Sequence, residues 1–514
     1  MASLNEQGGA LVLVGFMGAG KSSSARIAAA ELGVKALDSD RELETELGEP
    51  IESFFDREGE AAFREREEQV VLRLLEQGDA GVIALGGGAL GSERVRDALG
   101  AHTVVHMDVT PEDAWQRASN KGRPLARDKR RFEELHAERL AVYESVAHAL
   151  LPVAGREVMR RAFPALEALR DARAGGLEDI RLVWAEAASG AYPVFFGRGL
   201  VASGFVYPAD GRRFAVTDDQ VIERHRIEAE QTVTIPAGER HKTLSTVENV
   251  LGELTRAGME RGDLVVAVVG GVVGDLAGFC AATYQRGARY VQVPTTLVAQ
   301  VDSAYGGKTG VDLPEGKNYA GAYHQPSAVI CDPATLETLP PEELAAGYAE
   351  VVKTALIAGG SLWARVRRGG DVDDETILGC LRTKLAVVAE DERDGGRRQV
   401  LNLGHTVAHA IESATGYVRY RHGEAVGIGM LAALRLSGND ALRDEVSRLL
   451  EARGLPLTFD GATVDEVVAL TERDKKRQGG QVPFVLVKAP GDVTSGHRVS
   501  ADDLHAAVDE IHGG

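Results

Sequence analysis

The chain has 514 residues, of which 44% are hydrophobic, and its 58 basic and 77 acidic side chains give a formal net charge of −19. This length predicts about three to four domains, and the negative charge disfavours nucleic-acid and anionic-membrane partners, which need basic surfaces. The three cysteines lack CxxC spacing, and the N-terminus shows neither a signal peptide nor a bilayer-spanning segment, so a cytoplasmic protein is expected.

Strand-like apolar runs alternate with helical periodicity along most of the chain, which predicts the α/β class. We expect a P-loop domain in residues 1–170 and a linker at 171–179, where charges and a Gly-Gly pair break the periodicity. Short β-branched runs predict a Rossmann-like nucleotide-binding α/β domain in residues 180–330. Long amphipathic segments predict an α-helical domain in residues 331–514, and this domain also contains histidine and glutamate side chains that are candidates for metal binding.

The first functional motif is Gly15-Phe16-Met17-Gly18-Ala19-Gly20-Lys21-Ser22, directly after the apolar run Leu11 to Val14. A buried strand, a glycine-rich loop, Lys-Ser and a helix are the context of a P-loop, whose backbone N–H groups cradle phosphates. Lys21 supplies a positive charge, and the Ser22 hydroxyl can ligate Mg²⁺. The motif therefore predicts an ATP site formed by Gly18, Ala19, Gly20, Lys21, Ser22 and Ser23.

Further motifs supply carboxylates, guanidinium groups and bare backbone: Asp38-Ser39-Asp40, Arg64 in Phe63-Arg64-Glu65-Arg66-Glu67, Gly86-Gly87-Gly88, Arg123-Pro124-Leu125, and Arg139. Taken singly each is weak, because strand-end turns and solvated arginines are common. A guanidinium fork matches a substrate carboxylate, and a cationic segment suits a lid over ATP.

In this order and spacing the motifs resemble shikimate kinase over roughly residues 11–170. The resemblance implies that Asp40, Arg64, Gly87 and Arg139 bind shikimate. It also implies that Ser22 and Asp38 serve Mg²⁺ and that Arg123 is a lid arginine in contact with ATP. Lys21, Asp40 and Arg123 are then the catalytic residues of ATP-dependent phosphorylation of the shikimate 3-hydroxyl.

A second set of chemical groups lies far downstream. His405 and His422 each begin a predicted helix, and Glu350 lies on a third. Two histidines and a glutamate suit Zn²⁺ with positions left open for substrate, although spacing alone does not establish such a site. The groups nearby suit anions: Lys308, Lys317, Lys353, Lys384, Arg398, Asn402 and His409.

Upstream, Val268-Val269-Gly270-Gly271-Val272-Val273-Gly274-Asp275 places glycines after a buried strand, where a dinucleotide pyrophosphate can approach the backbone. The motif lacks the full GxGxxG pattern and is weak alone. Asp218, Glu239 and Lys242 are candidates to bind ribose hydroxyls.

Residues 180–514 resemble 3-dehydroquinate synthase. The stretches that carry the resemblance are Gly270 to Asp275, Ala281 to Gly287, Val293 to Leu297, Gln300 to Ser303, Gly306 to Thr309, Gly316 to Asn318 and Asp474 to Lys476. The resemblance implies Zn²⁺ or Co²⁺ on Glu350, His405 and His422. It implies NAD⁺ on Asp218, Glu239, Lys242, Gly271, Val272, Val273, Gly274, Asp275, Thr295, Thr296, Lys308 and Lys317. The implied contacts to the heptulosonate substrate are Arg286, Asp302, Asn318, Lys384, Arg398, Asn402, His409, Lys475 and Lys476.

The same resemblance implies catalytic roles for Lys308, Lys353 and His409, and a homodimer in which Arg286 reaches the neighbouring subunit. We therefore expect a bifunctional enzyme of aromatic amino acid biosynthesis. Its reactions are shikimate phosphorylation and the cyclisation of 3-deoxy-D-arabino-heptulosonate 7-phosphate to 3-dehydroquinate with phosphate release. NAD⁺ would accept a hydride and return it, and the metal would polarise substrate hydroxyls.

Two alternatives stay open. The second half could be another sugar phosphate cyclase or a metal-dependent polyol dehydrogenase, although Lys384 and Arg398 suit a substrate carboxylate better than a neutral polyol. The first half could be a nucleotide-binding module without catalytic turnover.

Overall fold

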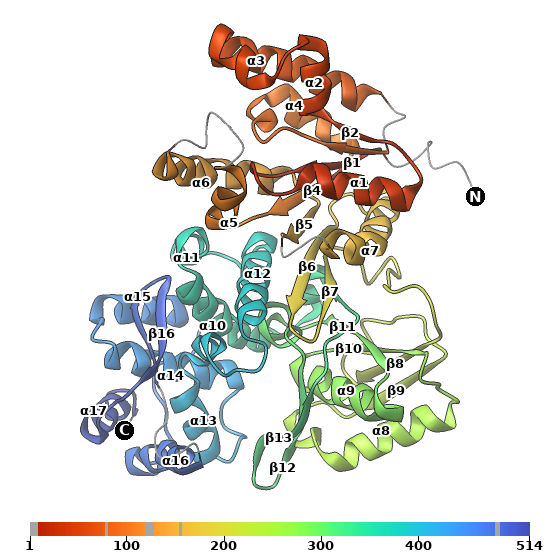
Figure 1. Ribbon diagram of the computed structural model, residues 1–514. Helices are drawn as coiled ribbons and strands as arrows, with labels where there is room; N and C mark the ends of the chain where they lie inside the picture. The colour runs from red at the N-terminus through yellow and green to blue at the C-terminus, as the bar shows by residue number, and fades with distance from the viewer. Residues whose placement is uncertain (1–8, 78–80, 120–127, 154–156, 478–483, 514) are drawn as a thin grey trace. The chain divides into compact units, whose positions relative to one another are not determined.

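The computed structural model describes residues 9–77, 81–119, 128–153, 157–477 and 484–513 (Figure 1). The chain forms two compact units, of which unit 1 comprises residues 1–184 and 193–198, and unit 2 residues 185–192 and 199–514. The predicted linker covers the end of α7 (Glu157–Ala174) and the turn before β6 (Arg181–Ala187). The division between the units lies a few residues further on, in the hairpin of β6 and β7 (Gly190–Phe196).

A parallel sheet forms the centre of unit 1, with strand order β2-β3-β1-β4-β5 and β6 paired to β5. Its strands are β1 (Leu11–Val14), β2 (Ala36–Asp38), β3 (Val82–Ala84), β4 (Thr103–Asp108) and β5 (Ala149–Pro152). All four residues of β1 are buried, as expected for a central strand with both faces covered. Because the order reverses at β1, the loops after β1, β2 and β3 meet at one edge, where α/β sheets bind ligands.

The helices of unit 1 connect these strands. In the described part of unit 1 they are α1 (Lys21–Leu32), α2 (Ser39–Leu47), α3 (Ile51–Glu76), η1 (Ala89–Gly91), α4 (Glu93–Ala98), η2 (Leu99–Ala101), α5 (Pro111–Ala118), α6 (Lys129–Val146) and α7. Helix α3 bends at Gly59, whose φ of 83° is outside the helical region. The predicted βα organisation of the first domain is confirmed.

The first part of unit 2 is also a parallel α/β layer, with strand order β14-β11-β10-β8-β9. The strands are β8 (Arg213–Asp218), β9 (Gln231–Ile235), β10 (Leu264–Val269), β11 (Arg289–Pro294) and β14 (Ala328–Cys331). Helices α8 (Leu244–Arg256) and α9 (Gly271–Thr283) pack together, and α9 contacts β8, β10 and β11. Short elements complete this part: η4 (Glu239–His241), η5 (Tyr284–Arg286), η6 (Ala299–Ser303) and the hairpin of β12 (Lys308–Leu313) and β13 (Gly316–Tyr323).

The second part of unit 2 is mainly helical, as the amphipathic segments predict (Figure 1). Its elements are η7 (Pro333–Thr338), α10 (Pro341–Ala358), α11 (Gly360–Val366), α12 (Asp374–Glu390), η8 (Arg397–Asn402), α13 (His405–Ala414), α14 (His422–Leu436), α15 (Asp440–Glu451), α16 (Val464–Arg477), β15 (Phe484–Ala489), β16 (Asp492–His497) and α17 (Ala501–Asp509). The β15–β16 hairpin was not predicted. No helix in the described ranges combines the length and apolar character needed to cross a membrane.

Two glycines allow α14 to pack tightly against its neighbours. A Cβ on Gly423 would overlap the carbonyl oxygen of Ala346 in α10, and one on Gly429 would overlap that of Gly404 before α13. Since only glycine permits such backbone approach, these positions fix α14 against α10 and α13. The first turn of α14 therefore lies beside α10, and the start of α13 lies beside the middle of α14.

Candidate active sites

The glycine-rich loop of unit 1 turns sharply between β1 and α1. Gly15, Gly18 and Gly20 have φ angles of 139°, 85° and 80°, which favour glycine. The Lys21 ammonium donates to the carbonyl oxygens of Gly15 (2.7 Å) and Phe16 (3.1 Å) and so lies along the loop. A Cβ on Gly20 would meet no atom within 4 Å, so open space adjoins the N-terminus of α1. Exposed N–H groups and a lysine fit a nucleotide phosphate, and Ser22 and Ser23 lie in the first turn.

The predicted acceptor residues of unit 1 gather around the triple glycine after β3. The Arg139 guanidinium donates to the Gly87 carbonyl (2.9 Å). A Cβ on Gly86 would collide with the Asp40 carboxylate, and one on Gly88 with the Arg64 guanidinium. The structure thus brings together all four residues that the sequence predicted for shikimate. Asp38 ends β2, and its Oδ1 accepts the Asp40 N–H (3.2 Å).

Two further residues of this site were missed by sequence reasoning. The Glu67 carboxylate, 5% exposed, accepts a hydrogen bond from Arg64 (2.5 Å), and the Tyr143 hydroxyl donates to Gly87 O (2.5 Å). Burial, together with the nearby Asp40 carboxylate, raises the pKa of Glu67 although Arg64 opposes the shift, and burial raises the pKa of Tyr143 to about 12. Helical spacing, i+3 from Arg64 and i+4 from Arg139, was the available signal. Arg123 lies outside the described residues.

In unit 2, three helices bring Glu350, His405 and His422 to one point. The Glu350 Oε1 atom lies 3.7 Å from His405 Nε2 and 3.5 Å from His422 Nε2. Ligands of a tetrahedral zinc with bonds of ~2.0 Å are about 3.3 Å apart. Glu350 is fully buried, with the Lys353 ammonium against its Oε2 atom and the two imidazoles facing its Oε1 atom. The three ligand atoms lie within 4.8 Å of one another, so the residues fit a divalent cation.

The electrostatics of the two imidazoles differ. Burial and the Lys353 ammonium lower the pKa of His405 to about 3, so this ring is neutral at pH 7, as a metal ligand must be. Burial lowers the pKa of His422, but hydrogen bonds to Glu350 and Glu412 outweigh it and raise this pKa to about 9. A cation therefore competes with a proton at His422.

A buried series of alternating charges continues from Glu350. Lys353, one turn further along α10, pairs with Glu350 and lies 3.6 Å from the Asp302 carboxylate. Asp302 lies in the π-helical turn η6 and also pairs with Lys384 of α12. Burial alone would raise the pKa of Asp302, but the two lysines hold it below its usual value. The Arg398 side chain, only 1% exposed, donates to the carbonyl oxygens of Glu392 and Gly306.

The predicted dinucleotide residues lie at the carboxyl end of the unit 2 sheet. A Cβ on Gly270 would contact Thr296, and one on Gly271 would contact Ser303, so bare backbone is required at the N-terminus of α9. Thr295 follows β11, and its buried hydroxyl has no partner among the described residues. Asp218 ends β8 and accepts the Gln220 and Val221 N–H groups. A glycine turn, a helix N-terminus and a partnerless buried hydroxyl fit a nucleotide.

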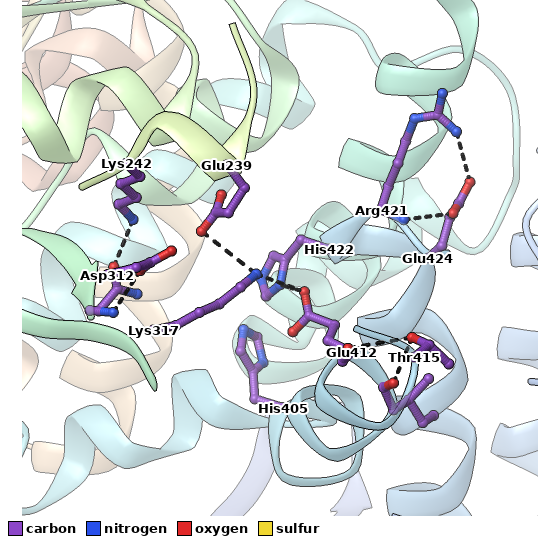
Figure 2. Close-up of polar contacts among 12 residues, drawn as sticks. Glu239, Lys242, Asp312, Lys317, His405, Glu412, Thr415, Arg421, His422 and Glu424 are labelled. Carbon is purple, nitrogen blue, oxygen red and sulfur yellow. Dashed lines mark hydrogen bonds and ion pairs between the residues drawn. The ribbon is translucent and has the colours of Figure 1, made fainter. Parts of the chain in front are cut away.

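The remaining dinucleotide candidates form a charged cluster in front of this edge. Lys242, which is 4% exposed, donates to Asp275 (2.7 Å) and to the Asn318 side chain (2.6 Å). Asp312 was not predicted; it accepts the Asn318 N–H (2.8 Å), where Asn318 has a φ of 58°. Lys317, adjacent in β13, lies 3.6 Å from Glu239 (Figure 2). The carboxylates thus hold the two lysines in place.

Other predicted residues lie less centrally. The exposed Lys308 ammonium pairs with Asp394 (2.5 Å), and the exposed Asn402 ends η8. The exposed Arg286 lies in η5, past the C-terminal end of α9. The His409 ring centroid is 5.5 Å from that of His405. The side chains of Lys475 and Lys476 on α16 lie outside the described residues, so their roles stay predictions.

Family models match three consecutive parts of the chain. They are shikimate kinase over residues 17–167, 3-dehydroquinate synthase N-terminal over 232–346 and 3-dehydroquinate synthase C-terminal over 347–477. The chain is 43% identical over 335 residues to the 3-dehydroquinate synthase of Halorhodospira halophila, covering 61% of this chain and 94% of the relative. It is 43% identical over 350 residues to that of Symbiobacterium thermophilum, covering 62% and 98%.

Two solved structures are similar to somewhat more than 60% of the chain. ValA, a 2-epi-5-epi-valiolone synthase from Streptomyces hygroscopicus with NAD⁺ and Zn²⁺ bound, is 27% identical, with a TM-score of 0.56 over 62% of this chain and 96% of its own. A 2-deoxy-scyllo-inosose synthase, 24% identical with a TM-score of 0.56 over 64% of this chain and 99% of its own, shares the fold.

Proposed function

The chain belongs to the 3-dehydroquinate synthase family, with a shikimate kinase domain fused ahead of it, and we propose that it catalyses two non-adjacent reactions of the shikimate pathway. Unit 1 phosphorylates shikimate with ATP and Mg²⁺. Unit 2 converts 3-deoxy-D-arabino-heptulosonate 7-phosphate to 3-dehydroquinate and releases phosphate. The observation that carries the synthase assignment is the convergence of Glu350, His405 and His422 in the part matched by the C-terminal synthase model.

In unit 1 the residues hold a carboxylate substrate opposite a nucleotide. Lys21 and the N–H groups of the loop would bind the ATP phosphates, and Ser22 and Asp38 would serve Mg²⁺, which neutralises charge on the transferring phosphoryl group. Arg64 and Arg139 would clamp the carboxylate of shikimate, and Asp40 would accept a proton from its 3-hydroxyl. Contacts to Glu67 and to Gly87 O fix the two arginines before substrate arrives.

In unit 2 the residues would hold a polyanionic sugar. NAD⁺ and the metal, when bound, supply reversible hydride transfer and polarisation of substrate hydroxyls. Lys384 and Arg398 are buried cations suited to the carboxylate and phosphate of the substrate, and Asp302 bridges the Lys353 and Lys384 ammonium groups and offsets their mutual repulsion. Lys353, Lys308 and His409 are the candidates to move protons at substrate hydroxyls.

Separate inactivation of the two units tests the assignment. On the full chain, shikimate-dependent ADP formation and NAD⁺-dependent 3-dehydroquinate formation are measured for the wild type, Lys21→Ala and His405→Ala. Lys21→Ala should abolish the first activity and leave the second within about twofold, and His405→Ala should do the reverse. A wild type that lacks either activity would contradict the proposal for that unit.

The same assay decides between related substrates. ValA and the inosose synthase share the fold of unit 2, so a neutral sugar phosphate is the rival substrate class. Substrates with and without the carboxylate are compared at equal concentration. Because Lys384 and Arg398 lie in the site, we expect the carboxylate-bearing heptulosonate to react at least 100-fold faster, and a preference for the neutral sugar would favour the rival.

We also propose that the protein is cytoplasmic and forms a homodimer through unit 2. All three cysteines are buried and free, which suits a reducing compartment. Tyr319 and Tyr323 of β13 are large side chains that are 53% and 44% exposed. Light scattering after gel filtration should give about twice the chain mass of 54.7 kDa, and Tyr323→Glu should lower it.

A further inference from the structure

Glu412 is a buried carboxylate to which neither the sequence analysis nor the proposed function gives a role. It lies on α13, two turns after His405, and is 2% exposed. Its Oε2 atom accepts no hydrogen bond from the described residues. A charged side chain in such a position costs free energy unless cations or hydrogen-bond donors compensate it.

The compensating groups are a metal ligand and a dinucleotide candidate. The Glu412 Oε1 atom lies 3.4 Å from His422 Nδ1 and 3.2 Å from Lys317 Nζ (Figure 2). His422 directs its other ring nitrogen, Nε2, toward Glu350. A carboxylate that accepts a hydrogen bond from Nδ1–H fixes the tautomer in which Nε2 carries the lone pair, and it orients the ring.

Lys317 is held from both parts of unit 2. It comes from the β13 hairpin of the α/β layer, where Glu239 lies 3.6 Å from its ammonium group. Its other contacts belong to the helical part, namely Glu412 and the Tyr417 ring, whose centroid is 4.8 Å away. Lys317 and Glu412 therefore form a direct link between the dinucleotide cluster and the metal cluster.

Because Lys317 and His422 share a single oxygen, their interactions with Glu412 are interdependent. A cation on Nε2 would polarise the Nδ1–H group and strengthen its bond to Oε1, which frees part of the Lys317 charge for an anionic ligand. A dinucleotide that draws Lys317 away would leave the carboxylate to His422 and make the imidazole a better ligand. Coupling between two binding sites is reciprocal, so the cation strengthens dinucleotide binding by the same factor as the dinucleotide strengthens cation binding.

We propose, on the basis of the function above, that Glu412 is a positioning residue through which divalent-cation binding and nicotinamide-dinucleotide binding strengthen each other. It does not touch the reacting atoms. Its carboxylate orients His422 on one side and restrains Lys317 on the other.

Cobalt titrations of the full-length protein test this proposal without recourse to turnover. The dissociation constant for Co²⁺ is measured from its visible absorption, with and without saturating NAD⁺. The variants are Glu412→Gln, which keeps the shape and removes the charge, Lys317→Met, and Glu451→Gln. Glu451 is exposed at the end of α15 and gives the same change in net charge. Circular dichroism checks that each variant is folded.

The expected wild-type result is Co²⁺ binding that is at least fivefold tighter with NAD⁺, within the usual range of coupling. Glu412→Gln should weaken Co²⁺ binding about 10–100-fold, the usual effect of losing such a carboxylate, and should abolish the effect of NAD⁺. Lys317→Met should abolish the effect of NAD⁺ while leaving Co²⁺ affinity without NAD⁺ within a few-fold. The Lys317 side chain is 24% exposed, so we expect Lys317→Met to fold, and it tests the coupling even if Glu412→Gln misfolds.

Three results would overturn the inference. The first is Glu412→Gln with wild-type Co²⁺ affinity and an unchanged effect of NAD⁺. The second is a cobalt spectrum that loses a carboxylate ligand in this variant, since His409, Glu412 and His422 could themselves surround a cation. The third is a wild type that binds Co²⁺ and NAD⁺ independently and yet makes 3-dehydroquinate, which leaves the proposed function intact. A wild type that binds neither would remove the proposed function as well.

Discussion

Asp302→Asn is predicted to destabilise unit 2 in a strongly pH-dependent way. Among the described residues, Asp302 is the only carboxylate that pairs with Lys384, and it lies 3.6 Å from Lys353, which keeps Glu350 as its second partner. Two charges ~4 Å apart interact by about 4 kcal/mol at an effective dielectric constant of about 20. Losing the carboxylate therefore costs about this amount while Lys384 stays charged.

Deprotonation of Lys384 limits the cost. Burial already lowers the pKa of Lys384, and loss of Asp302 lowers it further. A lysine in the unfolded chain has a pKa of about 10.4, so releasing the Lys384 proton costs about 5 kcal/mol at pH 7 and about 2 kcal/mol at pH 9. The unfolded variant then binds more protons than the folded one, so stability rises with pH. The expected loss of unfolding free energy is about 4 kcal/mol at pH 7 and about 2 kcal/mol at pH 9.

Denaturant unfolding of the full chain at pH 7, 8 and 9, in buffers free of phosphate and sulfate, measures this loss. Asp509→Asn, an exposed position near the end of α17, is the matched control and should change the free energy by less than ~0.5 kcal/mol. A deficit for Asp302→Asn that is the same at pH 7 and pH 9 would refute the reasoning, as would a wild-type transition at every pH.

Three further predictions concern single groups. Glu67→Gln removes the buried carboxylate that positions Arg64, so it should raise the KM for shikimate about tenfold and affect kcat less. An unchanged KM would show that Arg64 is positioned by other contacts. The Co²⁺ affinity of the Glu350, His405 and His422 site should rise about tenfold per pH unit from pH 7 to about pH 9, because the cation displaces a proton from His422. Titrations at pH 7, 8 and 9 should show this slope, and an affinity that does not change with pH would exclude competition between the cation and the proton. Burial lowers the pKa of His148 to about 4, and its Nδ1 accepts the Val104 N–H (3.0 Å), so the unfolding free energy of unit 1 should fall by up to about 3 kcal/mol as the pH falls from 6.5 toward 4. Denaturant unfolding of His148→Gln should show most of this pH dependence removed, and a variant as pH-sensitive as the wild type would count against it.

The sequence by itself determined the contiguous motifs and the order of the domains. A P-loop is made by one strand, its loop and the next helix, so Gly15 to Ser22 specify nearly all of its geometry. The strand order around β1 then places Asp40 and Gly87 at the same edge, as expected for loops after neighbouring parallel strands. Buried strands and amphipathic helices were likewise visible, because apolar periodicity reports which face of an element is covered.

Only the tertiary structure decided which distant charges share a site. Helix positions alone do not say that His422 Nε2 meets Glu350, since that depends on the backbone contact between Gly423 and Ala346. Glu67 and Glu412 are two acidic residues among 77, and burial next to Arg64 and His422 distinguishes them. Their roles depend on long-range packing and local dielectric, and neither is encoded in the spacing of a short motif.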